Sequence, residues 1–360
     1  MIYIFTFLGE FGYELFNWQG VIRKFSRTLS PSDKIICCSR ANLYPLYEKA
    51  SQYIDISQVK SFQRSVACGY FALHPYDLTS GLKRKLTFYQ RHRFDHRLKA
   101  ELKSFILQHL EGVKQSRNPK FRWWNLFSPQ GSDRSGEPYT FIFSSDKIRL
   151  NGCTFGCDRR RYGVDIAEGN IYDLLDLNNN LFQKIEPDLR VRASVEEKLG
   201  WDLTEPFVLC QTRNREIVIR SQEVVPKERL IEALAREIKV VLLSFHTGRY
   251  LDSYSAFKKL PNCFQYSCSS FTEQICLIHF ARHCLFFTER DFGSHIYVPP
   301  FLGKDVTAIA PATVYQLGTT PIDFWNQNVF RFGGQIIPKV SEEVFATPTK
   351  VRELIHEILS

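Results

Sequence analysis

The sequence lacks any apolar run near the roughly 20 residues that a helix needs to cross a bilayer, so we expect no membrane span. Its apolar first residues are interrupted by Glu10 and have no basic stretch before them, and we therefore expect no signal peptide. Internal repeats and low-complexity tracts are also missing. We therefore expect a cytoplasmic globular protein that is either soluble or peripheral to a membrane.

Metal-binding patterns are missing too, although the chain has ten cysteines. Cys153 with Cys157, and Cys263 with Cys268, have neither the spacing of a zinc site nor histidines at fixed offsets. No Asp-x-Asp triplet is present. Other cysteines lie in apolar segments, as Cys37 does in KIICCSR, where a thiol behaves as a small hydrophobic group. We expect reduced structural thiols and no bound metal.

What the chain does have is positive charge: its formal net charge is +9 and its sequence pI is near 9.0. The basic residues concentrate in segments 81–99, 118–124 and 157–163. Such a balance favours an anionic partner, which can be a nucleotide, a phospholipid surface or a nucleic acid. Trp123 and Trp124 lie among basic residues, as interfacial anchors do, so an anionic membrane surface is one expected partner. A solvated basic helix with core tryptophans is the alternative.

Strands and helices alternate along the chain, which predicts parallel sheets with right-handed crossovers. The apolar patterns predict strands over 2–7, 34–39, 137–145, 206–212, 239–246, 263–267, 284–289 and 305–310. They predict helices over 13–29, 82–112, 227–238, 271–283 and 348–360, a helix broken near Pro45 over 42–54, and a helix interrupted by two prolines over 293–303. A length of 360 residues suits two domains. The predicted fold is therefore α/β, with two Rossmann-like domains facing a cleft. We place the domains at 1–190 and 191–340, and expect the helix within 341–360 to pack back toward the N-terminal domain.

In open parallel sheets, ligands bind beyond the carboxyl ends of the strands. Polar, charged and glycine residues follow four predicted strands, whereas the strands themselves are apolar. The candidate site residues are Gly9, Glu10, Gly12 and Glu14 after the first strand, Arg213 and Arg215 after 206–212, His246 after 239–245, and Glu289, Asp291, Gly293, Ser294 and His295 after 284–288.

Two of these groups are suited to phosphate. Arg213 and Arg215 offer planar guanidinium forks that stay charged at any working pH. Gly293 and Ser294 would begin a helix, whose free N–H groups and dipole attract anions. The simpler alternatives are a loop of surface salt bridges for the arginines and a capping or core role for His246.

The segments FLGEFGYEL and FARHCLFFTERDFGSHIYVPPFLGKDVTAIAP resemble two elements of glycosyltransferases of the GT-B fold. The second is most similar to the nucleotide-binding half of heptosyltransferases, and the first resembles their acidic N-terminal loop. The first segment and TRNRE also resemble the glycine-rich and arginine-rich loops of fucosyltransferase-like enzymes. The resemblance covers roughly residues 1–30 and 206–310.

This resemblance implies an N-terminal acceptor domain and a C-terminal nucleotide-sugar domain. It implies transfer of a hexosyl or deoxyhexosyl group to a glycan or lipid-linked acceptor in polysaccharide synthesis, with the nucleotide sugar as co-substrate and without cofactor or metal. Glu10 would be the catalytic base and Glu14 the second choice, unless Glu14 only stabilises the helix start. Arg213, Arg215 and the start of the helix at 293–295 would neutralise the departing diphosphate. Glu289 or Asp291 would accept hydrogen bonds from hydroxyl groups.

Two other readings remain open. Polysaccharide pyruvyl transferases also pair two α/β domains and have a basic element with a histidine late in the chain, as TER and SH at 288–295 could be. A nucleic-acid-binding protein could use the basic segments with their interleaved aromatic residues. That third reading is less favoured, because it does not explain why polar residues gather at strand ends in both halves.

Overall fold

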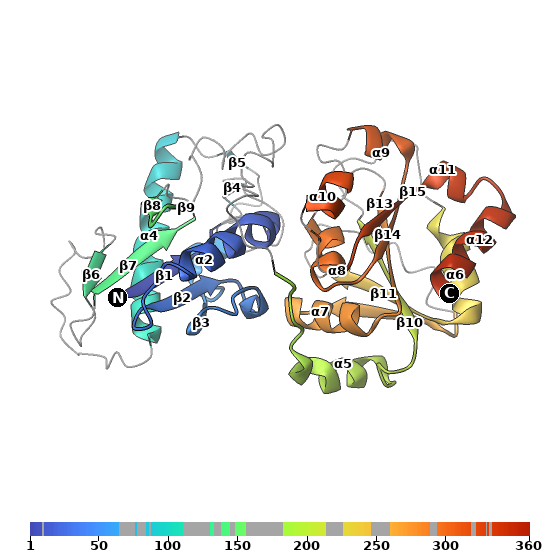
Figure 1. Cartoon of the computed structure of the whole chain (residues 1–360), viewed down its shortest axis with the longest axis horizontal. Coiled ribbons are helices and arrows are strands. Elements are labelled where there is room, and N and C mark those ends of the chain that lie inside the picture. Colours follow the sequence, from blue (N-terminus) through green and yellow to red (C-terminus); the bar gives the residue numbers. More distant parts are fainter. Residues whose placement is uncertain are drawn as a thin grey trace. The chain divides into compact units, whose positions relative to one another are not determined.

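The computed structural model contains two compact units, Met1–Phe182 and Gln183–Ser360. The structure describes residues 1–8, 11–64, 76–77, 84–85, 88–110, 130–132, 138–144, 148–155, 183–213, 226–245, 260–288, 294–317, 322–328, 330 and 333–360. Each unit contains a largely parallel sheet with helices, so the predicted α/β class with two Rossmann-like domains is confirmed (Figure 1). The division after residue 182 lies eight residues before the boundary that the sequence suggested.

Unit 1 has a five-stranded sheet with the order β3-β2-β1-β7-β6. Its strands are β1 (Ile2–Thr6), β2 (Lys34–Ser39), β3 (Gln52–Asp55), β6 (Gln130–Ser132) and β7 (Pro138–Phe143). All neighbours pair in parallel except β6, which runs antiparallel to β7 at the edge. The strand order reverses between β1 and β7, and the loop after β1 begins at this point.

The two faces of the unit 1 sheet are covered by different elements. Helix α4 (Phe88–His109) covers one face with Leu98, Leu102 and Ile106, which pack on Ile4 and Phe141. Aromatic rings cover the other face, where Phe5 packs against Trp18, Phe25 and Phe155 with ring centroids 5.0–6.0 Å apart. Successive side chains of β1 point to these two layers in turn, because side chains in a strand alternate between the two faces of the sheet.

The segment after β1 contains a π-helical turn. Short helix α1 (Phe11–Tyr13) leads into the π-helix η1 (Glu14–Trp18), and α2 (Gln19–Ser26) follows. The sequence predicted one continuous helix over 13–29. Its apolar spacing does not distinguish an α-helix, whose hydrogen bonds join residues four apart, from a π-helix, whose hydrogen bonds join residues five apart. π-Helical turns are rare and frequently occur at functional sites.

Unit 2 has a six-stranded sheet with the order β12-β11-β10-β13-β14-β15. Its strands are β10 (Phe207–Arg213), β11 (Lys239–Phe245), β12 (Cys263–Cys268), β13 (His283–Thr288), β14 (Val306–Ala310) and β15 (Ile336–Val340), and all neighbours are parallel. Counted from β10, this is the order 3-2-1-4-5-6 of dinucleotide-binding Rossmann domains. The order reverses between β10 and β13.

Two helices cover one face of the unit 2 sheet, and one of them corrects a prediction. Helix α6 (Lys227–Glu237) and helix α12 (Pro348–Leu359) share a core with β10, β11 and β13. The sequence analysis expected α12 to pack toward the N-terminal domain. Instead its buried residues Val351, Leu354 and Ile358 belong to the core of unit 2, where Figure 1 shows α12 beside α6.

The opposite face of this sheet faces α7 (Phe271–Phe280), which also contacts α5 (Arg192–Leu199) and α8 (Val298–Phe301). Residues 271–278 of α7 are all buried. This explains why the sequence pattern of α7 is apolar nearly all round. The remaining elements are η7 (Leu189–Val191), α9 (Ala312–Leu317), α10 (Ile322–Asn328), α11 (Ser341–Val344), the 3₁₀-helix η10 (Ser294–Tyr297) and, in unit 1, β4 (Tyr76–Asp77), β5 (Arg84–Lys85), β8 (Ile148–Leu150) and β9 (Cys153–Phe155).

One predicted helix is wrong. Residues 42–54 form a short 3₁₀-helix η2 (Tyr44–Leu46) and then strand β3, and α3 (Lys60–Arg64) follows. Pro45 lies within η2, and proline cannot continue a helix as a donor. Strand β15 and the β8–β9 hairpin were not predicted, because the strands of the hairpin have only three residues each and Pro338 interrupts β15. Within the described residues, no helix is both long and apolar enough to span a membrane.

Candidate functional site

The predicted site residues divide between described and undescribed positions. Gly12, Glu14, Arg213, Ser294 and His295 belong to the described part of the chain. The other predictions lie outside the described residues: Gly9, Glu10, Arg215, His246, Glu289, Asp291 and Gly293. What can be built from the structure is therefore one cluster at the carboxyl edge of each sheet.

In unit 2 the two strands at the reversal of strand order end side by side. Arg213, the last residue of β10, pairs in register with Thr288, the last residue of β13. The chain segments that leave these two strands begin at the crevice where ligands of such sheets bind. The sequence placed Arg213 and the 289–295 segment after separate strands, and the sheet brings those two strand ends together.

His295 lies on the chain just beyond β13, in the 3₁₀-helix η10, and is buried with 4% of its surface exposed. Its Nδ1 atom is 3.2 Å from the amide nitrogen Nε2 of Gln274, which is 0% exposed. An amide nitrogen can only donate, so Nδ1 accepts this hydrogen bond and the proton of the neutral ring is on Nε2. Gln274 therefore selects one tautomer of His295.

The start of α7 holds Gln274 at the carboxyl edge of the sheet. Ser270 follows β12 closely and caps α7, since its hydroxyl accepts from the backbone N–H of Glu273. The Glu273 carboxylate accepts in turn from Ser269 and from Lys198, whose Nζ is 2.6 Å away. These contacts hold the pKa of Glu273 below its ordinary value, even though burial acts to raise it. Gln274 is the next residue, in the first helical turn.

In unit 1 the corresponding edge carries a buried ion pair. Glu14 is 0% exposed, and its Oε2 atom accepts from Nη1 of Arg40 at 2.7 Å. Arg40 is the first residue after β2 and is itself 3% exposed. Its guanidinium carbon lies 5.7 Å from the ring centroid of Phe7, which follows β1. The pair thus joins the ends of β1 and β2 to the first residue of the π-helical turn.

Tyrosines complete this cluster. The hydroxyl of Tyr47 donates to Oε1 of Glu14, so both carboxylate oxygens are engaged. Tyr53 donates to the backbone carbonyl of Arg40, and its ring stacks on Tyr47 at 5.8 Å. Burial raises the pKa of the Glu14 carboxyl above its ordinary value of 4.5, although Arg40, Ser39 and Tyr47 act to lower it. Desolvation therefore outweighs the stabilising contacts.

This geometry bears on the role suggested for Glu14 as the second choice of base. A base must reach the proton it abstracts, and the Glu14 carboxylate is enclosed and already bonded on both oxygens. The arrangement favours a positioning role over proton abstraction. Glu10, the first choice, lies outside the described residues, and its role stays a prediction.

Sequence reasoning missed Arg40 and Gln274. Arg40 had a signal, because it follows directly on a strand that was predicted with its bounds correct. The rule used for the other strand ends would have selected it. Gln274 had only a weak signal: a single polar residue in the buried run FTEQICLIHF. Its partner His295 is 21 residues away in sequence, and no local pattern connects them.

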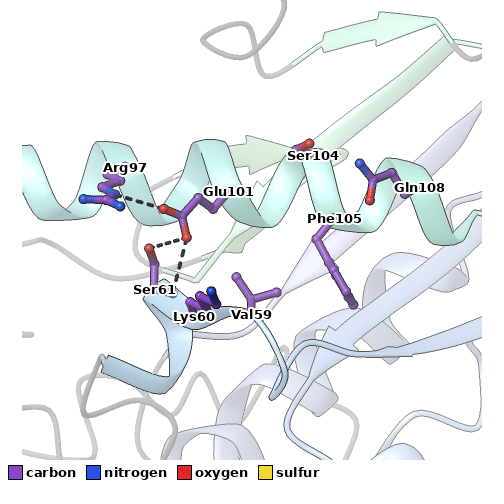
Figure 2. Close-up of a pocket in the computed structure, with 8 residues that line it drawn as sticks. All are labelled: Val59, Lys60, Ser61, Arg97, Glu101, Ser104, Phe105 and Gln108. Carbon is purple, nitrogen blue, oxygen red and sulfur yellow. Dashed lines mark hydrogen bonds and ion pairs between the residues drawn. The ribbon is translucent and has the colours of Figure 1, made fainter. Parts of the chain in front are cut away.

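An open groove of about 440 Å³ lies between α3 and α4 of unit 1, apart from the predicted site residues (Figure 2). Glu101 is at its centre and binds Arg97 at 2.9 Å and the backbone N–H of Ser61 at 3.3 Å. The groove is lined by Val59, Lys60, Ser61, Arg97, Glu101, Ser104, Phe105 and Gln108. Its one carboxylate is paired with Arg97, and Lys60 adds a second cation to the lining.

The described part of the chain contains no group of three or more His, Cys, Asp or Glu side chains that could hold a metal ion. The eight cysteines that the structure describes are free thiols. Burial raises the pKa of Cys37 and Cys210 well above the ordinary value, which suits packing rather than thiolate chemistry.

No protein-family model and no curated protein matches the sequence. Among solved structures, the chain is similar to the glycosyl transferase family 9 protein from Veillonella parvula (10% identity, 98% of this chain and 97% of that chain, TM-score 0.49). It is similar to the ADP-heptose LPS heptosyltransferase II of E. coli (12% identity, 100% and 98%, TM-score 0.48). A UDP-GlcNAc 2-epimerase from Neisseria meningitidis is also similar (10% identity, 99% and 94%, TM-score 0.38).

The first two of these proteins come from the group of enzymes that the sequence motifs resemble. Their identity to this chain is at most 12% and their TM-scores are below 0.5. An activity for this chain therefore has to be argued from its own sheet order and its own side chains.

Proposed function

We propose that this protein is a glycosyltransferase of the GT-B type that transfers a sugar from a nucleotide-sugar donor to a glycan or lipid-linked acceptor. In this proposal unit 2 binds the donor and unit 1 binds the acceptor. The transferred group is a hexose or deoxyhexose, and no metal takes part. The observation that carries the proposal is the 3-2-1-4-5-6 order of the unit 2 sheet, with Arg213 at the end of β10 and Thr288 at the end of β13 paired where the strand order reverses.

The chemistry of these residues supports a diphosphate at this edge. An arginine fork matches phosphate oxygens and keeps its charge throughout the reaction. A leaving nucleoside diphosphate gains negative charge as the glycosidic bond to it breaks, so a nearby cation stabilises the transition state more than the bound donor. Arg213 and Arg215 supply that charge, and Ser294 and His295 supply hydrogen-bond donors beside it.

The assignment of acceptor binding to unit 1 is supported by the sequence resemblance and by the positive charge of this unit. Glu10 takes the proton from the acceptor hydroxyl as the bond to the sugar forms. The basic segment 81–99 overlaps α4, in which Arg97 has 68% of its side chain exposed. A lipid-linked acceptor on an anionic membrane surface suits this charge, and so does peripheral membrane association of a cytoplasmic enzyme.

The test is nucleotide binding followed by turnover. We expect nucleoside diphosphates and nucleotide sugars to raise the thermal unfolding midpoint of the wild-type protein. Arg213→Ala should weaken this binding by about tenfold or more, because one charge-assisted contact is lost. Arg236→Ala is the matched control, since Arg236 is an exposed arginine of α6 in the same unit. Glu10→Gln should keep donor binding and lose turnover.

Two results would contradict the proposal. One is a wild-type protein that binds no nucleoside diphosphate at any concentration. The other is consumption of phosphoenolpyruvate without release of nucleoside diphosphate from any sugar donor, which would assign the chain to the pyruvyl transferases instead.

A further inference from the structure

The buried amide of Gln274 is not explained by stability. Among the described residues its Oε1 atom has no hydrogen-bond partner, although the side chain is 0% exposed. A buried polar atom without a partner costs about 1–3 kcal/mol relative to a satisfied one. An apolar side chain of similar length would avoid this cost in the helix α7, whose neighbouring positions are all buried. Groups that reduce stability in this way are commonly retained for function.

Within the part of the chain that the structure describes, the amide of Gln274 forms its hydrogen bond with His295. Gln274 Nε2 lies 3.2 Å from Nδ1, and both side chains are buried, so no solvent competes for this hydrogen bond. The two residues come from different elements, α7 and η10, which meet at the carboxyl edge of the unit 2 sheet. The capped first turn of α7 fixes Gln274, and η10 carries His295.

We propose that Gln274 is a positioning residue of the nucleotide site, which holds the His295 ring in the tautomer that donates a hydrogen bond from Nε2 to the donor diphosphate. This inference rests on the proposed function, because it assigns the receiving group to that ligand. A neutral imidazole with Nδ1 occupied as an acceptor has only its Nε2–H to offer, which suits phosphate oxygens. The histidine then acts as a donor without having to carry a positive charge.

The test compares two changes of the same kind at opposite edges of unit 2. Gln274→Met removes the amide but keeps the length of the side chain. Gln335→Met makes the same change at an exposed residue just before β15, at the amino edge of the sheet. If Gln274 served only the fold, Gln274→Met would leave nucleotide binding unchanged. If Gln274 is a positioning residue, Gln274→Met should weaken nucleoside diphosphate binding by about tenfold, measured by titration calorimetry. The thermal unfolding midpoint of this variant should be at or above that of the wild type.

Two further measurements identify the route of the effect. Nitrogen NMR of labelled histidine should show His295 as the Nε2–H tautomer in the wild type and as a mixture in Gln274→Met, with the signal assigned by its loss in His295→Asn. In the His295→Asn background, Gln274→Met should have no further effect on nucleotide binding, because the two residues act as one unit.

Three outcomes overturn the inference, and they are distinguishable. Unchanged nucleotide affinity in Gln274→Met, with binding by the wild type, refutes the role of Gln274 and leaves the proposed function standing. Additive effects of Gln274→Met and His295→Asn show that the residues act separately. Absence of nucleoside diphosphate binding in the folded wild type refutes the proposed function itself, and the inference with it.

Discussion

Each of the two sheets has a buried polar pair at its carboxyl edge, but the two pairs differ in their chemistry. In unit 1 the buried polar pair of Glu14 and Arg40 is charged, and tyrosine hydroxyls donate hydrogen bonds to the Glu14 carboxylate and to the Arg40 backbone carbonyl. In unit 2 the buried pair is neutral, and Gln274 meets His295 with one amide oxygen left without a partner among the described residues. Both pairs join a residue beyond one strand to a helix that begins at the same edge.

The two pairs differ in the free energy that it costs to bury them and to remove one partner. Two buried charges can be kept only when their remaining bonds are satisfied, and removing either partner leaves the other charge in a medium of low polarity. A neutral pair costs less to bury and less to lose, so it can be adapted to a ligand with little effect on folding. Substitutions at the sheet edge of unit 1 should therefore mainly lower its stability, and substitutions at the sheet edge of unit 2 should mainly weaken ligand binding.

Arg40→Met is expected to have the largest effect on folding. It leaves the Glu14 carboxylate buried without its cation and should lower the free energy of unfolding of unit 1 by about 3–5 kcal/mol. The measurement is denaturant unfolding, followed by hydrogen exchange in β1 and β2 so that the two units are read separately.

The control for this change is Arg97→Met, which breaks the exposed Arg97–Glu101 pair on α4 of the same unit. Such surface pairs contribute about 1 kcal/mol or less. Equal effects of the two substitutions would remove the proposed contrast between a buried and a surface charge.

Titration of the Glu14 carboxyl should also make the free energy of unfolding of unit 1 depend on pH. Burial raises the pKa of this carboxyl in the folded state above its ordinary value of 4.5. The folded state therefore binds the proton more tightly than the unfolded state, and stability is lost as the pH rises from the unfolded pKa to the raised folded pKa. Glu14→Gln should lack this part of the pH dependence of the free energy of unfolding.

The groups that face Glu14 do not titrate in the same window. Burial raises the pKa of Tyr47, Tyr53 and Cys37 well above their ordinary values, so they stay protonated throughout. The comparison is of slopes against pH, which does not require the variant to match the wild type in absolute stability. Identical slopes in the two proteins as the pH rises above the ordinary value of 4.5 would contradict a raised pKa for Glu14.

Ser270→Ala should have the smallest effect of the three. It removes the hydroxyl that caps α7 and should lower the free energy of unfolding of unit 2 by about 1 kcal/mol. Thr349→Ala, at an exposed position of α12 that caps nothing, is the control and should change it by less than about 0.5 kcal/mol. A loss for Ser270→Ala as large as that for Arg40→Met would show that the two edges do not differ as proposed.

The sequence by itself determined the local elements whose apolar runs are clear. Strand β2 has the predicted bounds, and β10, β11, β13 and α6 differ from their predictions by one residue at most at either end. These are short buried strands and an amphipathic helix, whose periods of two and 3.6 residues are properties of neighbouring residues alone. The same reasoning placed candidate ligand residues at strand ends, because a parallel sheet puts all its carboxyl ends at one edge.

Only the tertiary structure decided which side chains meet. Residues 42–54 have helical spacing, yet the free edge of β2 takes Gln52–Asp55 as a strand, so pairing overrode local preference. Glu14 meets Arg40 across 26 residues of sequence, and Gln274 meets His295 across 21. Such contacts depend on strand order, on sheet register and on where each helix begins, and these follow from the packing of whole layers rather than from any local pattern.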